Sequence, residues 1–411
     1  MAFTYDVNAV HNDKHSSWCL LICHMLITII NMFISTFFVA HIYTLSRDIF
    51  EYVKNVGIYY LIAYIVFAIS YCAFSYIVDR TKRIGVFRLS VFFRMSVVIV
   101  MIFFGQNLET ILPLSGFLYG FSGGAYYSSY NVLKQEMVSK RSMGDFATYA
   151  TMLAKAIEII APIGLGAIIS VSSFVDAAIY VAIITFAIFI VSFFIKAQKP
   201  EGSSFNLKGY LKVLKSNDES VKKIKYLYVT AFVYGFSTAT EALISLCIMM
   251  QFGSSLSLGS ITSIINAIVL IEIFVVNKFT KPGKRSYIYL ISMFLPIIGT
   301  LLFTLIPSMT TVVIFKFLLA ISLIIAMTEY DIYRNSNLKE AGLYNYIAEH
   351  QVVVEECFCA SRISGFTLIL LIGLMKSIIA FKILLVILSL TYSLLLLLLK
   401  IYESKHLKKV A

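Results

Sequence analysis

The sequence predicts an all-α membrane protein with twelve transmembrane helices in two six-helix pseudo-repeats, and three observations support this. First, 59% of the 411 residues are hydrophobic and only 14% are charged, whereas a soluble domain is about 25% charged. Second, the apolar residues form runs of about 20 residues or more, the length of a helix that crosses a bilayer. Third, a lysine-rich stretch near the middle of the chain divides these runs into six and six.

The composition excludes a soluble globular enzyme, a disordered chain and a secreted disulfide scaffold. Each span must be a helix, because a backbone in lipid has no water to satisfy its polar groups. We expect the spans, in chain order, at 18–44, 55–78, 87–105, 110–133, 147–171, 174–195, 226–251, 257–277, 286–306, 310–333, 350–375 and 378–400.

The basic residues indicate how these spans are oriented. The net charge of +12 comes largely from Lys and Arg in short loops, which the positive-inside rule explains better than nucleic-acid binding does. Loops 79–88 and 278–285 and the C-terminal tail are basic. The intervening loops hold no Lys or Arg: 106–109, 172–176, 252–256 and 307–309. Both termini are therefore predicted on the cytoplasmic side of the cell membrane.

The chain is predicted to have three segments. They are an N-terminal six-helix half at 1–195, a cytoplasmic connector at 196–225 and a C-terminal six-helix half at 226–411. The connector holds eight lysines, and Leu207, Leu211 and Leu214 are expected on one face of a short amphipathic helix. Either this helix anchors the connector to the lipid surface, or the connector is simply solvated.

A short internal repeat follows the second span of each half. Val78-Asp79-Arg80-Thr81-Lys82-Arg83 has a counterpart 198 residues later, Val276-Asn277-Lys278-Phe279-Thr280-Lys281. The first stretch resembles the signature Gly-x-Leu-Ala-Asp-Arg-x-Gly-Arg-Lys of the major facilitator superfamily. Asp79, Arg80 and Arg83 match it, whereas Ser75 and Lys82 replace its two glycines. The resemblance implies a transporter fold of this type and a conformational latch, which we expect at Asp79, Arg80, Arg83, Asn277 and Lys278.

Three further stretches resemble parts of this family. Gly120–Leu133 and Glu355–Gly365 are similar to a poorly characterised bacterial branch that is common in low-GC Gram-positive genomes. In the fifth span, Ala161-Pro162-Ile163-Gly164-Leu165-Gly166 is similar to the Gly-Pro-x-x-Gly-Gly element of family antiporters, apart from Ala161 and Leu165. This element indicates either an exporter or a kink that lets helices pack closely.

Ionisable residues inside the spans are the main candidates for transport, because each costs roughly 2.5–3.5 kcal/mol to insert. In the resembled fold, spans 3, 6, 9 and 12 lie on the outside. The charges fall mostly on the other spans, which line or flank the cavity. Arg94 in span 3 is the exception, and we expect it to snorkel to the cytoplasmic surface.

Two acid–base pairs lie near mid-depth. Lys155 and Glu158 are three residues apart in span 5 and share a helix face, with Glu158 about 18 Å from the inner end. Glu355 and Arg362 are two turns apart in span 11. Lys155 and Arg362 together predict a site for an anionic substrate, unless each is neutralised by its own glutamate. Glu158 is either part of an ion pair or a proton carrier.

Other candidates are single polar residues. Glu241 in span 7 has no basic residue close in sequence, which favours proton binding, a cationic substrate or a hydrogen bond to a neighbouring span. Asn31 in span 1 and Tyr127 in span 4 are predicted to contact the substrate. The histidines of span 1, His24 and His41, are candidates for proton exchange, and His41 for an interfacial role. A gating role is predicted for three acids near the cytoplasmic ends of spans 8 and 10, namely Glu272, Glu329 and Asp331.

These observations predict a secondary active transporter that moves a small molecule by alternating access. The more specific prediction is that transport is coupled to protons and that the substrate is exported. A lipid or glycolipid flippase on the same fold and a non-transporting sensor or scaffold are the alternatives. No enzyme is predicted, because the sequence lacks Walker, His-Glu-x-x-His and Gly-x-Ser-x-Gly motifs. No cofactor, metal or nucleic acid is expected; the predicted partners are a small-molecule substrate, protons and membrane lipids. The protein is expected to be a monomer, with its six cysteines as free thiols.

Overall fold

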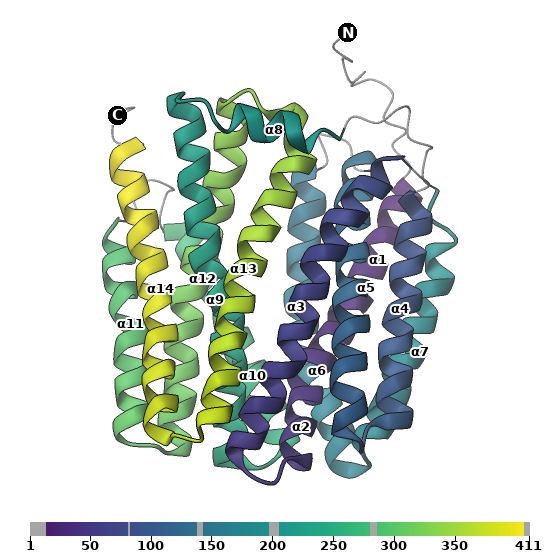
Figure 1. The fold of residues 1–411 in the computed structure, drawn as a ribbon, viewed down its shortest axis with the longest axis vertical. Helices are drawn as coiled ribbons and strands as arrows, with labels where there is room; N and C mark the ends of the chain where they lie inside the picture. The colour runs from purple at the N-terminus through teal and green to yellow at the C-terminus, as the bar shows by residue number, and fades with distance from the viewer. Residues whose placement is uncertain (1–13, 81–82, 138–142, 197–204, 280–285, 407–411) are drawn as a thin grey trace.

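The protein is a bundle of long helices that lie roughly parallel to one another, seen here in a computed structural model (Figure 1). The structure describes residues 14–80, 83–137, 143–196, 205–279 and 286–406, and within these ranges it contains no strand. We call the end of the bundle that carries the short helix α8 (Leu207–Val213) the connector end, and the opposite end the far end.

Within the described residues, six long helical stretches precede α8 and six follow it, with α1, η1 and α2 counted as one stretch. Before α8, the helices are α1 (Lys14–Met32), the π-helix η1 (Phe33–Phe38), α2 (Val39–Leu45), α3 (Ile49–Arg80), α4 (Arg83–Phe104), α5 (Leu108–Met137), α6 (Met143–Val171) and α7 (Phe174–Ser192). After α8, they are α9 (Glu219–Phe252), α10 (Ser255–Phe279), α11 (Ser286–Leu305), α12 (Met309–Glu340), the 3₁₀ turn η2 (Tyr344–Tyr346), α13 (Ile347–Met375) and α14 (Ile378–His406).

The prediction of an all-α membrane protein is confirmed. Within the described residues, ten helices are long and apolar enough to cross a membrane, with α1, η1 and α2 forming one of them. The helices α5 and α10 correspond to the two predicted spans that are not among these ten. In α10 the described part of the apolar stretch is Ser255–Ile271, and the side chains that follow it lie outside the described residues. The six cysteines are free, as expected.

The α5 helix is less apolar because it is built for contact with other helices. It packs along α3 and α4. Gly120 lies against the backbone of Ala63, and Gly124 lies against Ser70, so that a side chain at either glycine would collide with α3. Small residues at such positions allow two helix backbones to approach closely.

Helices from before and after the connector pair directly with each other. The α3 helix packs along α13, and α6 packs along α10; α3 and α13 run side by side in Figure 1. Near the far end, a Cβ atom added to Gly373 would lie 2.5 Å from the backbone N of Lys54, and one added to Gly57 would lie 2.8 Å from the Cα of Leu370. The two helices therefore touch backbone to backbone at this end.

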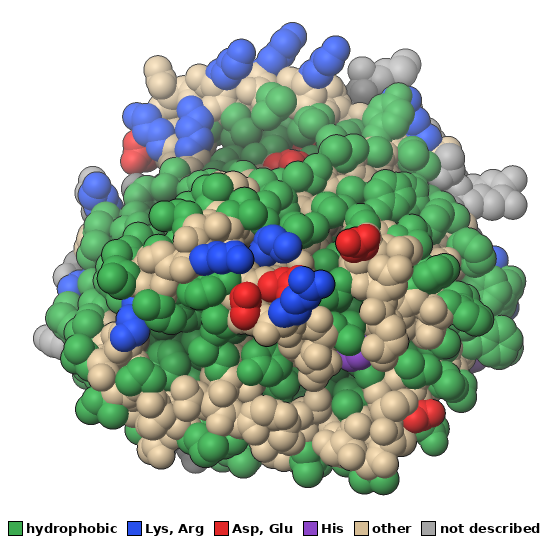
Figure 2. Space-filling model, turned by 60° about the horizontal axis from the view of Figure 1, so that its bottom comes forward, with side chains coloured by type: hydrophobic (Ala, Val, Ile, Leu, Met, Phe, Trp, Pro, Cys, Tyr) green, Lys and Arg blue, Asp and Glu red, His purple; other side chains and the backbone are tan. Residues whose placement is uncertain are grey.

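Charged side chains gather near the middle of the far end (Figure 2). The carboxylate of Asp48 accepts hydrogen bonds from the N–H groups of Phe50 at 2.7 Å and Glu51 at 2.8 Å, which begins α3. The N–H of Glu51 lowers the pKa of Asp48, and Phe50, Lys376 and Lys54 act in the same direction. Asp48 thus links the start of α3 electrostatically to the turn after α13.

The connector helix α8 is docked on the bundle, which matches neither prediction for it. Tyr210 is fully buried, and its hydroxyl lies 2.5 Å from that of Tyr228 on α9 and 3.1 Å from Nδ1 of His350 on α13. The expected leucine face is wrong: Leu211 is exposed, whereas Leu214 is buried with Tyr210. Residues four apart share a helix face, and here the inward face is the one that carries Tyr210.

Candidate functional site

A partly buried acid on α9 and a buried base on α12 lie within electrostatic reach of each other, without a direct ion pair. Glu241 on α9 and Lys316 on α12 attract each other electrostatically. Lys316 is only 7% exposed, and its ammonium group donates a hydrogen bond of 3.1 Å to Oγ1 of Thr262 on α10. The pair and its hydrogen bond therefore connect three helices.

The sequence analysis missed Lys316, because it sought a partner for Glu241 only among nearby residues. The signal was present in the sequence. Lys316 is the only charged residue between Thr310 and Met327, in the middle of a predicted span. An ionisable residue at such a position is by default a functional candidate with a partner on another helix.

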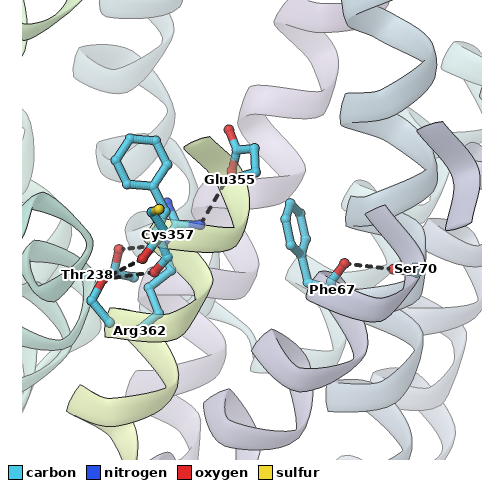
Figure 3. Close-up of polar contacts among 8 residues, drawn as sticks. Phe67, Ser70, Thr238, Glu355, Cys357 and Arg362 are labelled. Carbon is cyan, nitrogen blue, oxygen red and sulfur yellow. Dashed lines mark hydrogen bonds and ion pairs between the residues drawn. The ribbon is translucent and has the colours of Figure 1, made fainter. Parts of the chain in front are cut away.

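A second pair lies on α13. The Nη1 atom of Arg362 is 3.9 Å from Oε2 of Glu355, and both side chains are 21% exposed. The Nε–H of Arg362 also donates to Oγ1 of Thr238 on α9, at 3.3 Å. Figure 3 shows Arg362 between Glu355 and Thr238, with Phe67 of α3 on the facing side. The Arg362 guanidinium lies over the ring of Tyr64 at 5.2 Å, which again brings α3 next to α13.

The predicted contact residue Asn31 binds an arginine. Its Oδ1 accepts a hydrogen bond from Nη1 of Arg94 on α4. Arg94 is 2% exposed, so the expectation that it snorkels to the surface is wrong. Its guanidinium lies 5.3 Å from the ring centroid of Tyr119 and 5.7 Å from that of Tyr126. The side chain turns inward toward α1 and α5, which supply a hydrogen-bond acceptor and aromatic faces, instead of extending along the helix to water.

Tyr127 lies between the two arginines. It interacts electrostatically with Arg94 and with both Glu355 and Arg362. Its ring packs against Tyr126, with centroids 5.0 Å apart, and against Phe67 at 6.1 Å. The structure thus brings together four of the predicted site residues, Asn31, Tyr127, Glu355 and Arg362, and adds Arg94 to them.

The other predicted pair is a closed ion pair. Nζ of Lys155 is 2.6 Å from Oε2 of Glu158, with the two side chains 21% and 26% exposed. The backbone carbonyl of Glu158 also accepts a hydrogen bond of 2.8 Å from Asn266 on α10. Within the described residues, no contact joins Lys155 to Arg362. Arg94 and Arg334 are cations within electrostatic reach of Tyr127 and Glu355, respectively, whereas Lys155 is neutralised on its own helix.

The two histidines of the first span have partners. Nδ1 of His24 lies 2.6 Å from the hydroxyl of Tyr126, and the His24 ring stacks on Tyr130 at 4.4 Å. Nε2 of His41 is 2.9 Å from the carbonyl of Gly105. His24 therefore belongs to the aromatic surroundings of Arg94, whereas His41 lies toward the far end.

Only part of the predicted latch is described. The Arg80 guanidinium lies 3.6 Å over the ring of Tyr76, and Arg83 is buried. The other predicted latch and gate side chains lie outside the described residues, namely Asp79, Asn277, Lys278, Glu272, Glu329 and Asp331. The latch stays a prediction.

The antiporter-like element in α6 is a helix contact. A Cβ atom on Gly166 would lie 2.9 Å from the carbonyl oxygen of Ser255, and Gly259 of α10 lies against the carbonyl of Pro162. Gly164 has open space around it. Gly166 is thus explained by the close approach of α6 and α10, where Pro162 also meets α10.

Comparison with known proteins agrees with this architecture. The family model for the Major Facilitator Superfamily matches residues 17–339. No curated protein matches the sequence. Among solved structures, a POT family transporter in complex with 5-aminolevulinic acid is similar, with a TM-score of 0.70 and 13% sequence identity over 95% of this chain and 96% of that chain. A bacterial homologue of the iron transporter ferroportin in an inward-facing state has a TM-score of 0.66 and 14% identity over 95% and 98% of the two chains.

At these identities the structural likeness shows the fold alone, so the substrate has to be argued from this chain's own residues. The family model, however, covers more than half of the chain. The chain therefore belongs to the Major Facilitator Superfamily, a family of membrane transporters.

Proposed function

We propose that this protein is a proton-coupled secondary transporter that moves a small molecule across the cell membrane by alternating access. Family membership supports small-molecule transport. The observation that supports coupling is the electrostatic attraction between partly buried Glu241 on α9 and buried Lys316 on α12. We further propose that both termini are cytoplasmic and that residues 1–195 and 226–411 move as two halves.

The coupling argument starts from the cost of an unpaired buried charge. An ion pair in a low-dielectric interior is tolerable while both partners are charged, but removing one charge leaves the other uncompensated. Protonation of Glu241 would leave Lys316 with Thr262 as its hydrogen-bond partner. The relative energies of different arrangements of α9, α10 and α12 then depend on whether Glu241 carries a proton. A ligand can shift a conformational equilibrium only through such a differential interaction.

Glu241 is a better proton carrier than Glu158. Glu158 is held by Lys155 at 2.6 Å on the same helix, and both side chains keep some contact with solvent. Both charges of that pair lie on α6, so their attraction does not link two helices. Glu241, in contrast, faces a cation on another helix.

Export is the direction that we propose, on the resemblance of Ala161–Gly166 to an antiporter element. The packing of Gly166 and Pro162 against α10 also gives these residues a structural role. The flippase and sensor alternatives have no separate observation in their favour among the described residues.

The coupling proposal can be tested without knowing the substrate. Purified protein in proteoliposomes is adsorbed to a solid-supported membrane, and a pH jump is applied. The wild type should give a transient current as Glu241 takes up or releases its proton. Glu241→Gln should lose most of this current, whereas Glu109→Gln, which removes an exposed acid at the start of α5, should keep it.

The double variant Glu241→Gln with Lys316→Gln guards against misfolding, because it removes both buried charges together. It should fold and should also lack the current. A full-sized current from either Glu241 variant would contradict the assignment of the proton to Glu241.

A further inference from the structure

Among the described residues, no carboxylate contacts the buried cation Arg94. It is 2% exposed, and the hydrogen bond that the described residues give it goes to Oδ1 of Asn31. Its Nε–H is buried and has no acceptor. A guanidinium carries five N–H donors and no acceptor, so most of its hydrogen-bonding capacity is unused. Buried charges in proteins are normally paired, because an unpaired one is costly.

The rings of Tyr119 and Tyr126 do not remove this deficit. They lie 5.3 Å and 5.7 Å from the guanidinium carbon, within the range of cation–π attraction. Such contacts stabilise the charge through the ring faces. They supply no hydrogen-bond acceptor for the N–H groups, which lie in the plane of the guanidinium.

Polar hydroxyls without partners surround the same place. Within the described residues, the hydroxyl of Tyr59 is buried without a hydrogen bond, and those of Tyr64, Tyr119 and Tyr127 make none. These four groups are mutually close, since Tyr119 interacts electrostatically with Tyr59, Tyr64 and Tyr127. Buried polar groups are usually satisfied, but only the Tyr59 hydroxyl is fully buried; Tyr64, Tyr119 and Tyr127 are partly buried. One buried and three accessible hydroxyls without protein partners, close to a cation, indicate a place for a ligand.

The charges limit what that ligand is. Arg94 lies over the ring of Tyr119 at 5.3 Å and Arg362 over that of Tyr64 at 5.2 Å, and Tyr127 is within electrostatic reach of both arginines. Arg362 already has Glu355 at 3.9 Å, which leaves Arg94 as the cation to be neutralised. One unpaired cation with amide and hydroxyl neighbours suits a singly charged planar anion, because guanidinium binds a carboxylate through two parallel N–H···O bonds.

The surrounding side chains favour an aromatic body on that carboxylate. Tyr64 stacks on Phe366 at 5.6 Å, Tyr127 meets Phe67 at 6.1 Å, and Tyr119 faces Tyr59 at 6.4 Å. Flat ring faces such as these pack well against another ring. A long aliphatic chain or a sugar would gain less from them.

We propose that Arg94, with Asn31 and the hydroxyls of Tyr119 and Tyr127, binds the carboxylate of an aromatic monocarboxylic acid, which is the transported substrate. This proposal rests on the transport function proposed above and names its substrate class. The carboxylate accepts from the Arg94 N–H groups and from the tyrosine O–H groups. The aromatic body lies toward Tyr64 and Phe67, between α3 and α13.

The test is a thermal-shift titration of the purified full-length protein in detergent. The probes are benzoate, 4-hydroxybenzoate and phenylacetate, each matched with its neutral amide, at pH 7.5. At least one carboxylate should raise the melting temperature of the wild type, because a ligand that binds the folded state stabilises it, and its amide should not. Arg94→Gln should weaken carboxylate binding by about 10- to 100-fold, as expected for a lost charge-assisted hydrogen bond.

Arg88→Gln is the matched control, since Arg88 lies on the same helix but bonds the carbonyl of Ser192 and stacks on Phe193. It should bind the carboxylate as the wild type does. Tyr127→Phe provides a milder variant that keeps its ring and should weaken binding by roughly three- to tenfold. Carboxylate binding by Tyr127→Phe can be measured even if Arg94→Gln fails to fold.

The proposal is overturned if none of the three carboxylates stabilises the wild type, if the amides stabilise it equally, or if Arg94→Gln and Tyr127→Phe both bind as the wild type. Glu241→Gln separates this proposal from proton coupling, because it should still bind the carboxylate. Binding that persists without a pH-jump current counts against coupling alone. A current that persists without carboxylate binding counts against the Arg94 site alone.

Discussion

Arg362 and Glu355 lie two turns apart on one face of α13 with their charged atoms 3.9 Å apart, and both remain about one-fifth exposed. This is a loose ion pair, at the upper limit of a direct contact. Arg362 divides its donors between Glu355 and Thr238, and its face lies against Tyr64. The arginine is therefore held by α13, α9 and α3 at once, and rearranging any of these helices changes its surroundings.

Removing one partner of this pair should destabilise the protein more than removing both. Glu355→Gln leaves Arg362 without its carboxylate and should lower the free energy of unfolding by about 1–3 kcal/mol, less than for a fully buried pair. The double variant Glu355→Gln with Arg362→Gln should lose less than the sum of the single variants. Thermal unfolding in detergent measures all three.

The exposed pair Glu219 and Lys222 on α9 is the matched control. Its atoms are 3.7 Å apart, but the side chains are 70% and 55% exposed. Glu219→Gln should change stability by less than about 1 kcal/mol. Strictly additive losses for the Glu355 and Arg362 variants would show that the two residues do not interact.

Glu158→Gln should leave the pH-jump current unchanged. The carboxylate of Glu158 is held by Lys155 at 2.6 Å, and the partial exposure of the pair lets water share the charge after substitution. We expect a loss of no more than about 1 kcal/mol in stability. A current reduced as strongly as in Glu241→Gln would transfer the coupling role to Glu158, so the two variants are to be compared in the same preparation.

The sequence predicted the local pairs and failed on the distant ones, for a geometric reason. Lys155 and Glu158 share a helix face because they are three residues apart, and helix geometry alone brings them together. The partners Glu241 and Lys316 come from different helices. Their meeting depends on how α9 and α12 pack, which no single helix encodes.

Arg94 shows the same limit of prediction from sequence. Counting residues along α4 gave its depth, but not which way the side chain turns. Its direction depends on Asn31 of α1 and Tyr119 of α5, which lie beside it only after the helices assemble. The glycines of α5, in contrast, allow close helix contact simply by lacking a side chain, and Gly120 and Gly124 lie against α3.

The docking of α8 should fail at alkaline pH through Tyr210. Burial raises the pKa of Tyr210 to about 12, whereas an exposed tyrosine titrates near 10. The unfolded protein therefore loses this proton before the folded protein does. The stabilisation is complete below about pH 10 and is lost as the pH rises toward 12. Part of the alkaline loss of stability should disappear in Tyr210→Phe, as thermal unfolding at pH 8 and 10.5 would show.

At neutral pH, Tyr210→Phe removes the contacts with Tyr228 and His350 and should cost about 0.5–1.5 kcal/mol. Tyr210→Ala should release α8, so that limited proteolysis cuts the connector faster. Leu211→Ala, which truncates an exposed side chain of the same helix, should leave the cutting rate unchanged. Equal rates for Tyr210→Ala and the wild type would show that Tyr210 does not hold α8 in place.

The far-end contact between α3 and α13 should be sensitive to a single methyl group. A Cβ atom on Gly373 would lie 2.5 Å from the backbone N of Lys54, and backbone atoms cannot move aside as a flexible side chain can. Gly373→Ala should therefore cost about 1–3 kcal/mol and push the two helices apart at this end. Gly164→Ala on α6, where nothing lies within 4 Å of the added atom, makes the same chemical change without a collision and should not destabilise. If the two alanine variants unfold at the same temperature, α3 and α13 do not meet this closely in the membrane protein as purified. If only Gly373→Ala unfolds earlier, a cysteine placed at Lys54 should also react faster with a thiol reagent in that variant, because the contact that shields it has opened.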